Sequence, residues 1–245
     1  MKHPETNIES IGDLLEKLSG HTGDYQGPIW YRGHSINSWN LEPKLMRIPH
    51  RPPETHYLNK FKQDASIILN HSPRTEFEWL FLMQHYGVAT RLLDWSESPL
   101  VGLYFALENN LDQDGALWVL LPCELNLKSN YRPDFEFEIP SFEDEHLKGY
   151  VPSTIASESK SKLLPMAAIA PRNSSRMQAQ QGVFTISHRE NIFIDQAGPD
   201  GAPKNHIWKY KIPQNKKERL RKELVMLGIT RFQLFPELES LALKI

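Results

Sequence analysis

The stretch FLMQHYGVATRLLDW, residues 81–95, combines the end of a helix with a short apolar run. Residues 77–86 predict a helix that ends at Gly87, because glycine readily adopts the backbone conformation that terminates helices. Residues 90–95 are apolar with a charge near each end, which predicts a strand that runs into a turn. The next segment, 99–107, begins with proline and predicts a second helix. The region therefore predicts one buried strand between two helices.

Outside this region, the sequence predicts further helices and strands in an irregular order. Helical spacing of apolar residues predicts helices, and short apolar or alternating runs predict strands. Further helices are expected at residues 8–18, 57–70 and 216–227 and from about 236, and further strands at 28–33, 116–121, 167–171, 182–186 and 206–212. Because strands and helices do not alternate strictly, we expect one α+β domain over residues 1–245. Its sheet is expected to be central and mixed or antiparallel, with a helical N-terminal portion.

Two polar segments carry separate expectations. Residues 122–165 show neither the helical nor the strand period, so we expect an irregular excursion over the surface that could serve as a lid. The run KKERLRK, residues 216–222, is expected to be the solvated face of a helix, and nucleic-acid contact is the alternative.

Composition narrows the class of protein. The chain has 245 residues, 40% of them hydrophobic, and a net charge of −2, so no basic excess indicates a nucleic-acid partner. A single cysteine, Cys123, provides neither an intrachain disulfide nor a cysteine-based zinc site. The longest apolar stretch, 99–107, is far shorter than the roughly 20 residues that span a bilayer. We expect a cytoplasmic protein that binds no membrane and no metal.

Arg32 is the first candidate for a functional site. It lies in an apolar run, and a buried guanidinium needs a carboxylate or a ligand anion as partner. Its partner could be Asp94, or it could bind the phosphate or carboxylate of a ligand. Arg91 and Asp94 lie three residues apart, so on a strand they face opposite ways and are not expected to pair. We expect Arg32, Arg91, Asp94 and Gln181 to converge on one cleft.

Several neighbours could act with these four residues. His85 could carry a proton or only interact with a helix end, and His34 could share a strand face with Arg32. Gln84 precedes His85 and adds a polar group to the same helix end. Trp95 could stack on a base or a sugar, or it could belong to the core.

A cluster of amides near residue 180 offers hydrogen-bond donors and acceptors. Gln178, Gln180 and Gln181 form a cluster beside Gly182, which would let backbone approach a ligand closely. Amide groups recognise base edges and carboxamides well. Arg176 adds a cation that could reach a phosphate. A turn held by bonds from side chains to the backbone is the alternative.

Three blocks together resemble the FRG family, which is named for a Phe/Tyr-Arg-Gly motif. They are YRG at residues 31–33, FLMQHYGVATRLLDW at 81–95 with PLVGLYFA at 99–106, and RMQAQQGVF at 176–184. The resemblance extends over residues 28–240.

The chain also resembles, more loosely, the ADP-ribosyltransferase fold. That resemblance implies that Arg32 grips the phosphates of NAD, that Ser96 takes the second motif position, and that Gln181 or Gln178 stands where a glutamate is expected. It further implies an NAD- or nucleotide-binding ADP-ribosyltransferase or NAD glycohydrolase, such as a bacterial toxin or defence effector, with a macromolecular acceptor as one option. Because an amide cannot act as a base, a non-catalytic module that binds a ligand or a partner is the alternative.

Overall fold

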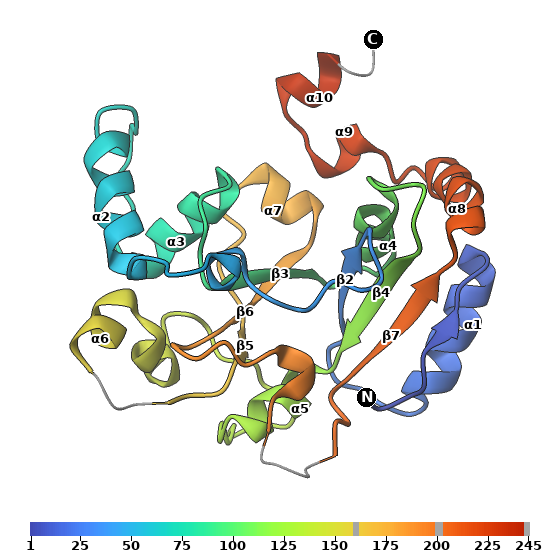
Figure 1. Ribbon diagram of the computed structural model, residues 1–245, viewed down its shortest axis with the longest axis horizontal. Coiled ribbons are helices and arrows are strands. Elements are labelled where there is room, and N and C mark those ends of the chain that lie inside the picture. Colours follow the sequence, from blue (N-terminus) through green and yellow to red (C-terminus); the bar gives the residue numbers. More distant parts are fainter. Residues whose placement is uncertain (159–161, 199–202, 243–245) are drawn as a thin grey trace.

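A seven-stranded mixed sheet forms the centre of the computed structural model, which describes residues 1–158, 162–198 and 203–242 (Figure 1). The strand order is β1-β7-β4-β2-β3-β6-β5, with β1 parallel to β7 and all other pairs antiparallel. The strands are β1 (Thr6–Asn7), β2 (Trp30–His34), β3 (Leu92–Ser96), β4 (Gly115–Leu120), β5 (Met166–Ala168), β6 (Gly182–Ile186) and β7 (Ile207–Ile212). The predicted α+β class and mixed sheet are confirmed.

Ten α-helices and three 3₁₀ helices accompany the sheet within the described ranges. The α-helices are α1 (Ile11–Thr22), α2 (Glu54–Ala65), α3 (Glu76–His85), α4 (Pro99–Leu107), α5 (Pro122–Lys128), α6 (Pro152–Ser157), α7 (Ser175–Ala179), α8 (Gln214–Met226), α9 (Arg231–Leu234) and α10 (Leu238–Ala242), and the 3₁₀ helices are η1 (Lys44–Arg47), η2 (Glu145–Tyr150) and η3 (Ile194–Gln196). Ser10, Thr75 and Ser98 begin α1, α3 and α4 by accepting a backbone N–H, as N-cap residues do. The short helix α7 was not predicted.

Helices cover the sheet in two groups. Helices α1, α4 and α8 bury their apolar residues against β2, β4 and β7 in one core cluster, which includes Leu14, Leu103 and Leu220. Helices α2 and α3 bury theirs against β3, β5 and β6 in a second cluster, which includes Leu58 and Leu80. Strands β2 and β3 mark the boundary between these two clusters, and a third core cluster, which includes Trp30, Trp95 and Trp118, extends across both strands.

Gly33 of the YRG motif permits the tight packing of α4 on β2. A Cβ atom at Gly33 would collide with the carbonyl oxygen of Gly102 and the amide nitrogen of Ala106. Gly102 in turn lies against Tyr31, where a side chain would meet the Cβ atom of the tyrosine at 2.9 Å. Paired glycines let a helix approach a strand this closely because neither has a side chain to accommodate.

Strands β2 and β3 share only one paired position. Tyr31 lies opposite Ser96, whereas β2 pairs with β4 along all five of its residues. Beyond that position the two strands turn away from one another (Figure 1). The sheet therefore splits beside Arg32 on β2 and Asp94 on β3.

The segment 122–165 departs from the predicted irregular excursion. Its described residues include α5, η2 and α6, and Phe142, Leu147 and Tyr150 are buried in the second core cluster. The prediction of a surface lid is therefore wrong for the described part, because these large apolar side chains anchor it in the core. Residues 159–161 lie outside the described ranges.

Lys217 corrects the prediction of a fully solvated helix face at 216–222. Its side chain is buried, and its Nζ donates to the carbonyl oxygens of Ser35 and Asn110, at 2.8 Å each. Burial lowers the pKa of Lys217, and the carboxylates of Asp112 and Asp114 oppose this change. The lysine thereby holds together two loops, at Ser35 and Asn110, that border the cavity described next.

Candidate functional site

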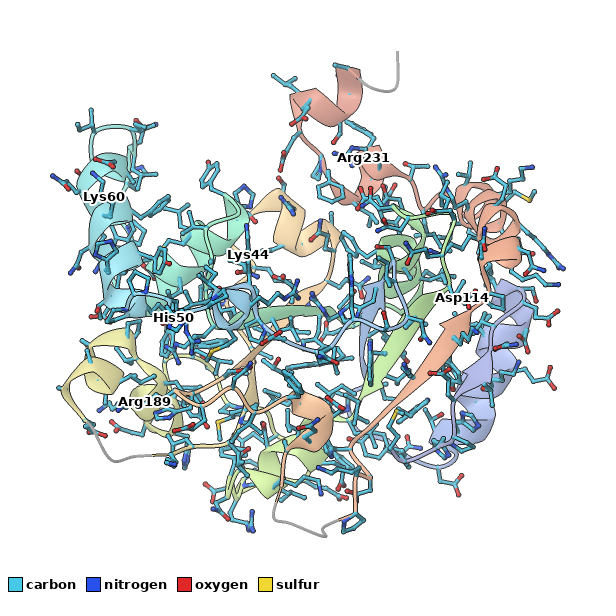
Figure 2. The ribbon with its side chains drawn as sticks, in the orientation of Figure 1. Lys44, His50, Lys60, Asp114, Arg189 and Arg231 are labelled. Atoms are coloured by element: carbon cyan, nitrogen blue, oxygen red, sulfur yellow. The ribbon has the colours of Figure 1, made fainter. Side chains whose placement is uncertain are left out.

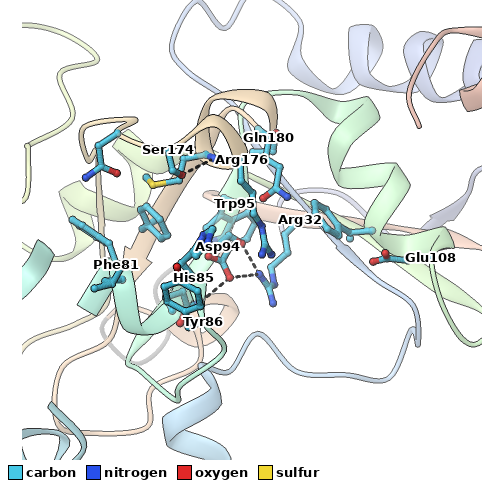
Figure 3. Close-up of a pocket in the computed structure, with 18 of the residues that line it drawn as sticks. Arg32, Phe81, His85, Tyr86, Asp94, Trp95, Glu108, Ser174, Arg176 and Gln180 are labelled. Carbon is cyan, nitrogen blue, oxygen red and sulfur yellow. Dashed lines mark hydrogen bonds and ion pairs between the residues drawn. The ribbon is translucent and has the colours of Figure 1, made fainter. Parts of the chain in front are cut away.

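A cleft of about 990 Å³ opens where β2 and β3 separate (Figure 3). Residues 31–35 of β2 and its loop, residues 94–96 of β3, and residues from α3, α4 and α7 line it. Both the strand split and the helices that flank it thus contribute to the walls. Clefts of this volume accommodate ligands of the size of a nucleotide.

Arg32 extends into the split of the sheet. Its Nη1 donates to the carbonyl oxygen of Asp94 at 2.5 Å, and its Nε donates to Nε2 of His34 at 3.2 Å. The guanidinium thus links β2 to β3 beyond the one position at which the two strands pair. Its Nη2 donates no hydrogen bond within the described residues, and 19% of the side chain is exposed at the cleft. Burial lowers the pKa of Arg32 to about 10, against the raising effect of Asp94, so the group stays charged at neutral pH.

Asp94 presents the carboxylate closest to Arg32. Its Oδ2 lies 3.9 Å from Nη1 of Arg32, and 55% of its side chain is exposed. The Nε2 of Gln84 donates to the same carboxylate oxygen at 2.8 Å, and the hydroxyl of Thr90 donates to Oε1 of Gln84 at 2.6 Å. This chain of bonds fixes the amide of Gln84 and, through it, the orientation of Asp94.

His34 is buried beside Arg32 and is neutral. Burial, helped by the charge of Arg32, lowers its pKa to about 3. Its Nε2 accepts from Nε of Arg32, and its Nδ1 lies 3.3 Å both from the carbonyl oxygen of Trp39 and from the indole Nε1 of Trp118, which is a donor. The tautomer with its hydrogen on Nδ1 satisfies Arg32 and Trp39 and leaves Trp118 without this acceptor. His34 therefore orients Arg32 instead of adding a charge.

The opposite wall of the cleft is formed by α7 and the C-terminal segment. Arg176 lies 4.6 Å from the ring of Phe235, and Gln180 donates from Nε2 to the carbonyl oxygen of Leu234 at 3.1 Å. His85 faces this wall, and burial, together with the charge of Arg176, lowers its pKa. At neutral pH the ring is therefore a neutral imidazole that can accept a proton.

Ser96 has a supporting position in this wall. Its hydroxyl donates to the carbonyl oxygen of Gln180 at 2.7 Å and accepts from the amide of Ser98 at 3.0 Å. Both bonds tie the start of α4 to the end of α7, so the side chain is used for the architecture of the wall.

The predicted convergence of four residues is only partly right. Arg32 and Asp94 meet in the cleft, but Arg91 is buried elsewhere, with its Nε 2.7 Å from Oε2 of Glu54. As predicted, Arg91 does not pair with Asp94. Gln181 is exposed and is not among the residues that line the cleft.

Two other predicted ligand contacts do not fit their positions. Gln178 is exposed on α7 outside the cleft. Trp95 borders the cleft, but only 3% of it is exposed and its Nε1 donates to the hydroxyl of Thr185 at 3.0 Å. It packs in a core cluster with Trp118 and Leu93, so its ring is not free to stack on a ligand.

Sequence reasoning overlooked many residues of the cleft as site residues, among them Trp39 and Arg47. Arg47 belongs to residues 43–53, which are rich in Pro and Arg, and Trp39 lies just before them; neither stretch has a periodic signal. Gln180 was considered only as part of the amide cluster and lines the cleft. A tryptophan in the mostly polar stretch 34–40 was the one available signal.

Two general features were searched in the described residues. No group of three or more His, Cys, Asp or Glu side chains in them is arranged to hold a metal ion. None of their helices has the length and apolar character needed to cross a membrane.

Residues 27–115 match the model of the FRG domain. The chain therefore carries an FRG domain, and the resemblance to this family is confirmed for that range. The match contains Arg32, Gln84 and Asp94, so the split between β2 and β3 lies inside it. No curated protein and no solved structure matches the chain.

Proposed function

We propose that the cleft binds a nucleotide, NAD in particular, and that the protein is an ADP-ribosyltransferase-like enzyme. The observation that carries this proposal is the guanidinium of Arg32, which lies where β2 and β3 separate and keeps one nitrogen without a hydrogen bond within the described residues. The Nη2 of Arg32 makes no hydrogen bond within the described residues, and Arg32 lines the cleft. A planar guanidinium with free N–H groups fits the oxygens of a phosphate.

The charges of the cleft favour an anionic ligand. Arg32, Arg47 and Arg176 line it, against the carboxylates of Asp94, Glu78 and Glu108. Glu108 accepts from Nη1 of Arg231 at 2.6 Å, and Glu78 accepts from the amide of Arg74. Neither Arg47 nor Arg176 forms an ion pair with a carboxylate of the described residues. The arginines therefore leave positive charge for a ligand to neutralise.

Asp94 gives the cleft a carboxylate that could act in catalysis. When bound, NAD supplies an ADP-ribosyl group, and positive charge develops on its ribose as nicotinamide leaves. A carboxylate held in place stabilises such charge without having to reorient, and Asp94 is held by Gln84. Asp94 would thus take the role of the glutamate that is expected at the position of Gln181 or Gln178.

A module that binds a nucleotide without cleaving it is the second candidate. It is favoured by the two residues between α7 and β6, where Gln180 contributes an amide to the cleft and Gln181 is exposed and does not line it. An amide can hold a carboxamide or a ribose hydroxyl but cannot act as a base.

Release of nicotinamide from NAD separates the two candidates. Purified wild-type protein is expected to release nicotinamide, and Asp94→Asn is expected to be slower by about 10²-fold or more while still binding ADP-ribose. Asp134→Asn is the matched control, because Asp134 is exposed and does not line the cleft. Binding without release would select the non-catalytic module, and absence of binding would contradict both candidates.

A further inference from the structure

Arg47 lines the cleft and keeps one guanidinium nitrogen without a hydrogen bond within the described residues. It is the last residue of η1, in the segment that Lys44 and His50 mark in Figure 2. Its Nε and Nη2 both donate to the carbonyl oxygen of Glu42, at 3.0 and 2.6 Å. This grip fixes one edge of the guanidinium, while Nη1 donates no hydrogen bond within the described residues. A fixed guanidinium loses little further freedom on binding an anion.

Arg47 and Arg32 line the same cleft, so each adds positive charge to the surroundings of the other. After burial, the charge of Arg47 is a further cause of the lowered pKa of Arg32, and it also contributes to the lowered pKa of His34. The neutral ring of His34 does not offset the positive charge of the two arginines. Asp94 offsets Arg32 only in part, at 3.9 Å. An anion with two charges between the two arginines would remove the repulsion and satisfy donors of both.

Trp39 is unlike the other tryptophans of the chain. It is 44% exposed, whereas the other five, Trp30, Trp79, Trp95, Trp118 and Trp208, are at most 6% exposed. Its ring lies beside that of His34, with the centroids 6.1 Å apart, and it lines the cleft. An exposed indole in the wall of a cleft offers a flat apolar surface on which a base or another planar ring can stack.

We propose that Arg32 and Arg47 together bind the diphosphate of the ligand and that Trp39 stacks on one of its rings. This inference rests on the proposed function and assigns the phosphate end of the cleft. Arg176 is the other cation of the cleft, but the ring of Phe235 covers it at 4.6 Å. The opposite wall would therefore hold the less charged end of the ligand, near His85 and Gln180.

Three probes separate the two parts of this subsite: inorganic pyrophosphate, ADP-ribose and adenosine, each titrated calorimetrically into the full chain. Arg47→Gln is expected to weaken pyrophosphate and ADP-ribose by roughly tenfold to a hundredfold and to leave adenosine unchanged. Trp39→Ala is expected to weaken ADP-ribose and adenosine and to leave pyrophosphate unchanged. Arg51→Gln is the matched control, because it removes the same charge from a side chain that donates to Met46 and borders a different cavity.

The outcomes distinguish this inference from the proposed function. If the wild type binds ADP-ribose and Arg47→Gln binds it equally well, the inference is wrong and the proposed function stands. If the wild type binds pyrophosphate, weakly in Arg47→Gln, but binds no ADP-ribose, the phosphate subsite stands and the nucleotide function is wrong. Equal losses in Arg47→Gln and Arg51→Gln would show an effect of net charge alone and overturn the inference, as would no binding of any probe. A melting temperature within about 2 °C of wild type confirms that each variant is folded.

Discussion

Arg91 and Arg32 occupy similar stretches of sequence and contrasting surroundings. Arg91 is buried, with Nε bound to Glu54 and with Nη1 and Nη2 donating to the carbonyl oxygens of Ser187 and Tyr150, at 2.6 Å each. Arg32 lines the cleft and uses only two of its three guanidinium nitrogens in hydrogen bonds within the described residues. In an apolar stretch, an arginine whose three guanidinium nitrogens all donate within the protein has a structural role. An arginine with an unbonded nitrogen can still bind a ligand.

The sharpest expected contrast between the two regions is in stability. Arg91→Met leaves the carboxylate of Glu54, whose side chain is 6% exposed, buried without its partner. It should lower the free energy of unfolding by about 3–5 kcal/mol, or the melting temperature by roughly 6–20 °C. Chemical denaturation monitored by fluorescence measures the change.

Two comparisons qualify that result. Replacing both members of the pair, Arg91→Met with Glu54→Leu, should cost less than the sum of the single changes, because no charge is left unpaired. Arg219→Met is the control, since this arginine pairs with Glu223 on the exposed face of α8, where such pairs contribute about 0.5 kcal/mol or less. A loss below about 1 kcal/mol in Arg91→Met would remove the distinction between the two arginines.

Acid should destabilise the protein through His34, which supports Arg32. The unfolded chain binds a proton at this residue as the pH falls below about 6.5, whereas the folded pKa is lowered to about 3. Stability is therefore present above pH 6.5 and lost as the pH falls toward 3, by up to about 1.4 kcal/mol per pH unit.

His34→Gln should reduce this slope by about one proton between pH 6 and pH 4. His206→Asn should act similarly, because burial lowers the pKa of His206 to about 4. The exposed His71 serves as the control position, with His71→Gln. Unfolding free energies measured at several pH values give the slopes, and an unchanged slope in His34→Gln would show that the ring is protonated in the folded state.

The smallest expected effect is the energetic coupling between Arg32 and Asp94. Their charged atoms lie 3.9 Å apart and the side chain of Asp94 is 55% exposed, so solvent screens the pair and the coupling should stay below about 1 kcal/mol. A double-mutant cycle of Arg32→Lys and Asp94→Asn in denaturation measures it. A coupling above about 2 kcal/mol would mean that Arg32 serves Asp94 as a structural partner.

Local sequence signals predicted the helices and strands around the cleft, but they did not predict how these elements come together to form it. Pro99 predicted the start of α4 and Gly87 the end of α3, because proline and glycine act on the backbone within a few residues of themselves. The separation of β2 from β3 depends on pairing between distant segments, and no local pattern reports where such pairing stops. Residues 116–121 were likewise predicted as a strand, without its partners.

The late amides show how one residue decides such a prediction. Gln181 adopts a left-handed backbone, with φ of 47°, and its side chain lies outside the cleft that Gln180 lines. A sequence pattern does not distinguish neighbouring residues at such a turn. Lys217 escaped prediction for a similar reason: its buried partners are carbonyl groups, which have no signature in the sequence.

Binding of ADP-ribose to wild-type protein and to Arg32→Lys tests the central claim most directly. Lysine keeps the charge of Arg32 but lacks the planar guanidinium that can bind a phosphate through two nitrogens. Calorimetric titration should show binding to the wild type and a loss of roughly tenfold to a hundredfold in Arg32→Lys, equivalent to about 1.5–3 kcal/mol, with little change in melting temperature. Equal affinity of the two proteins, or no binding by the wild type, would contradict the assignment of the cleft as a nucleotide site.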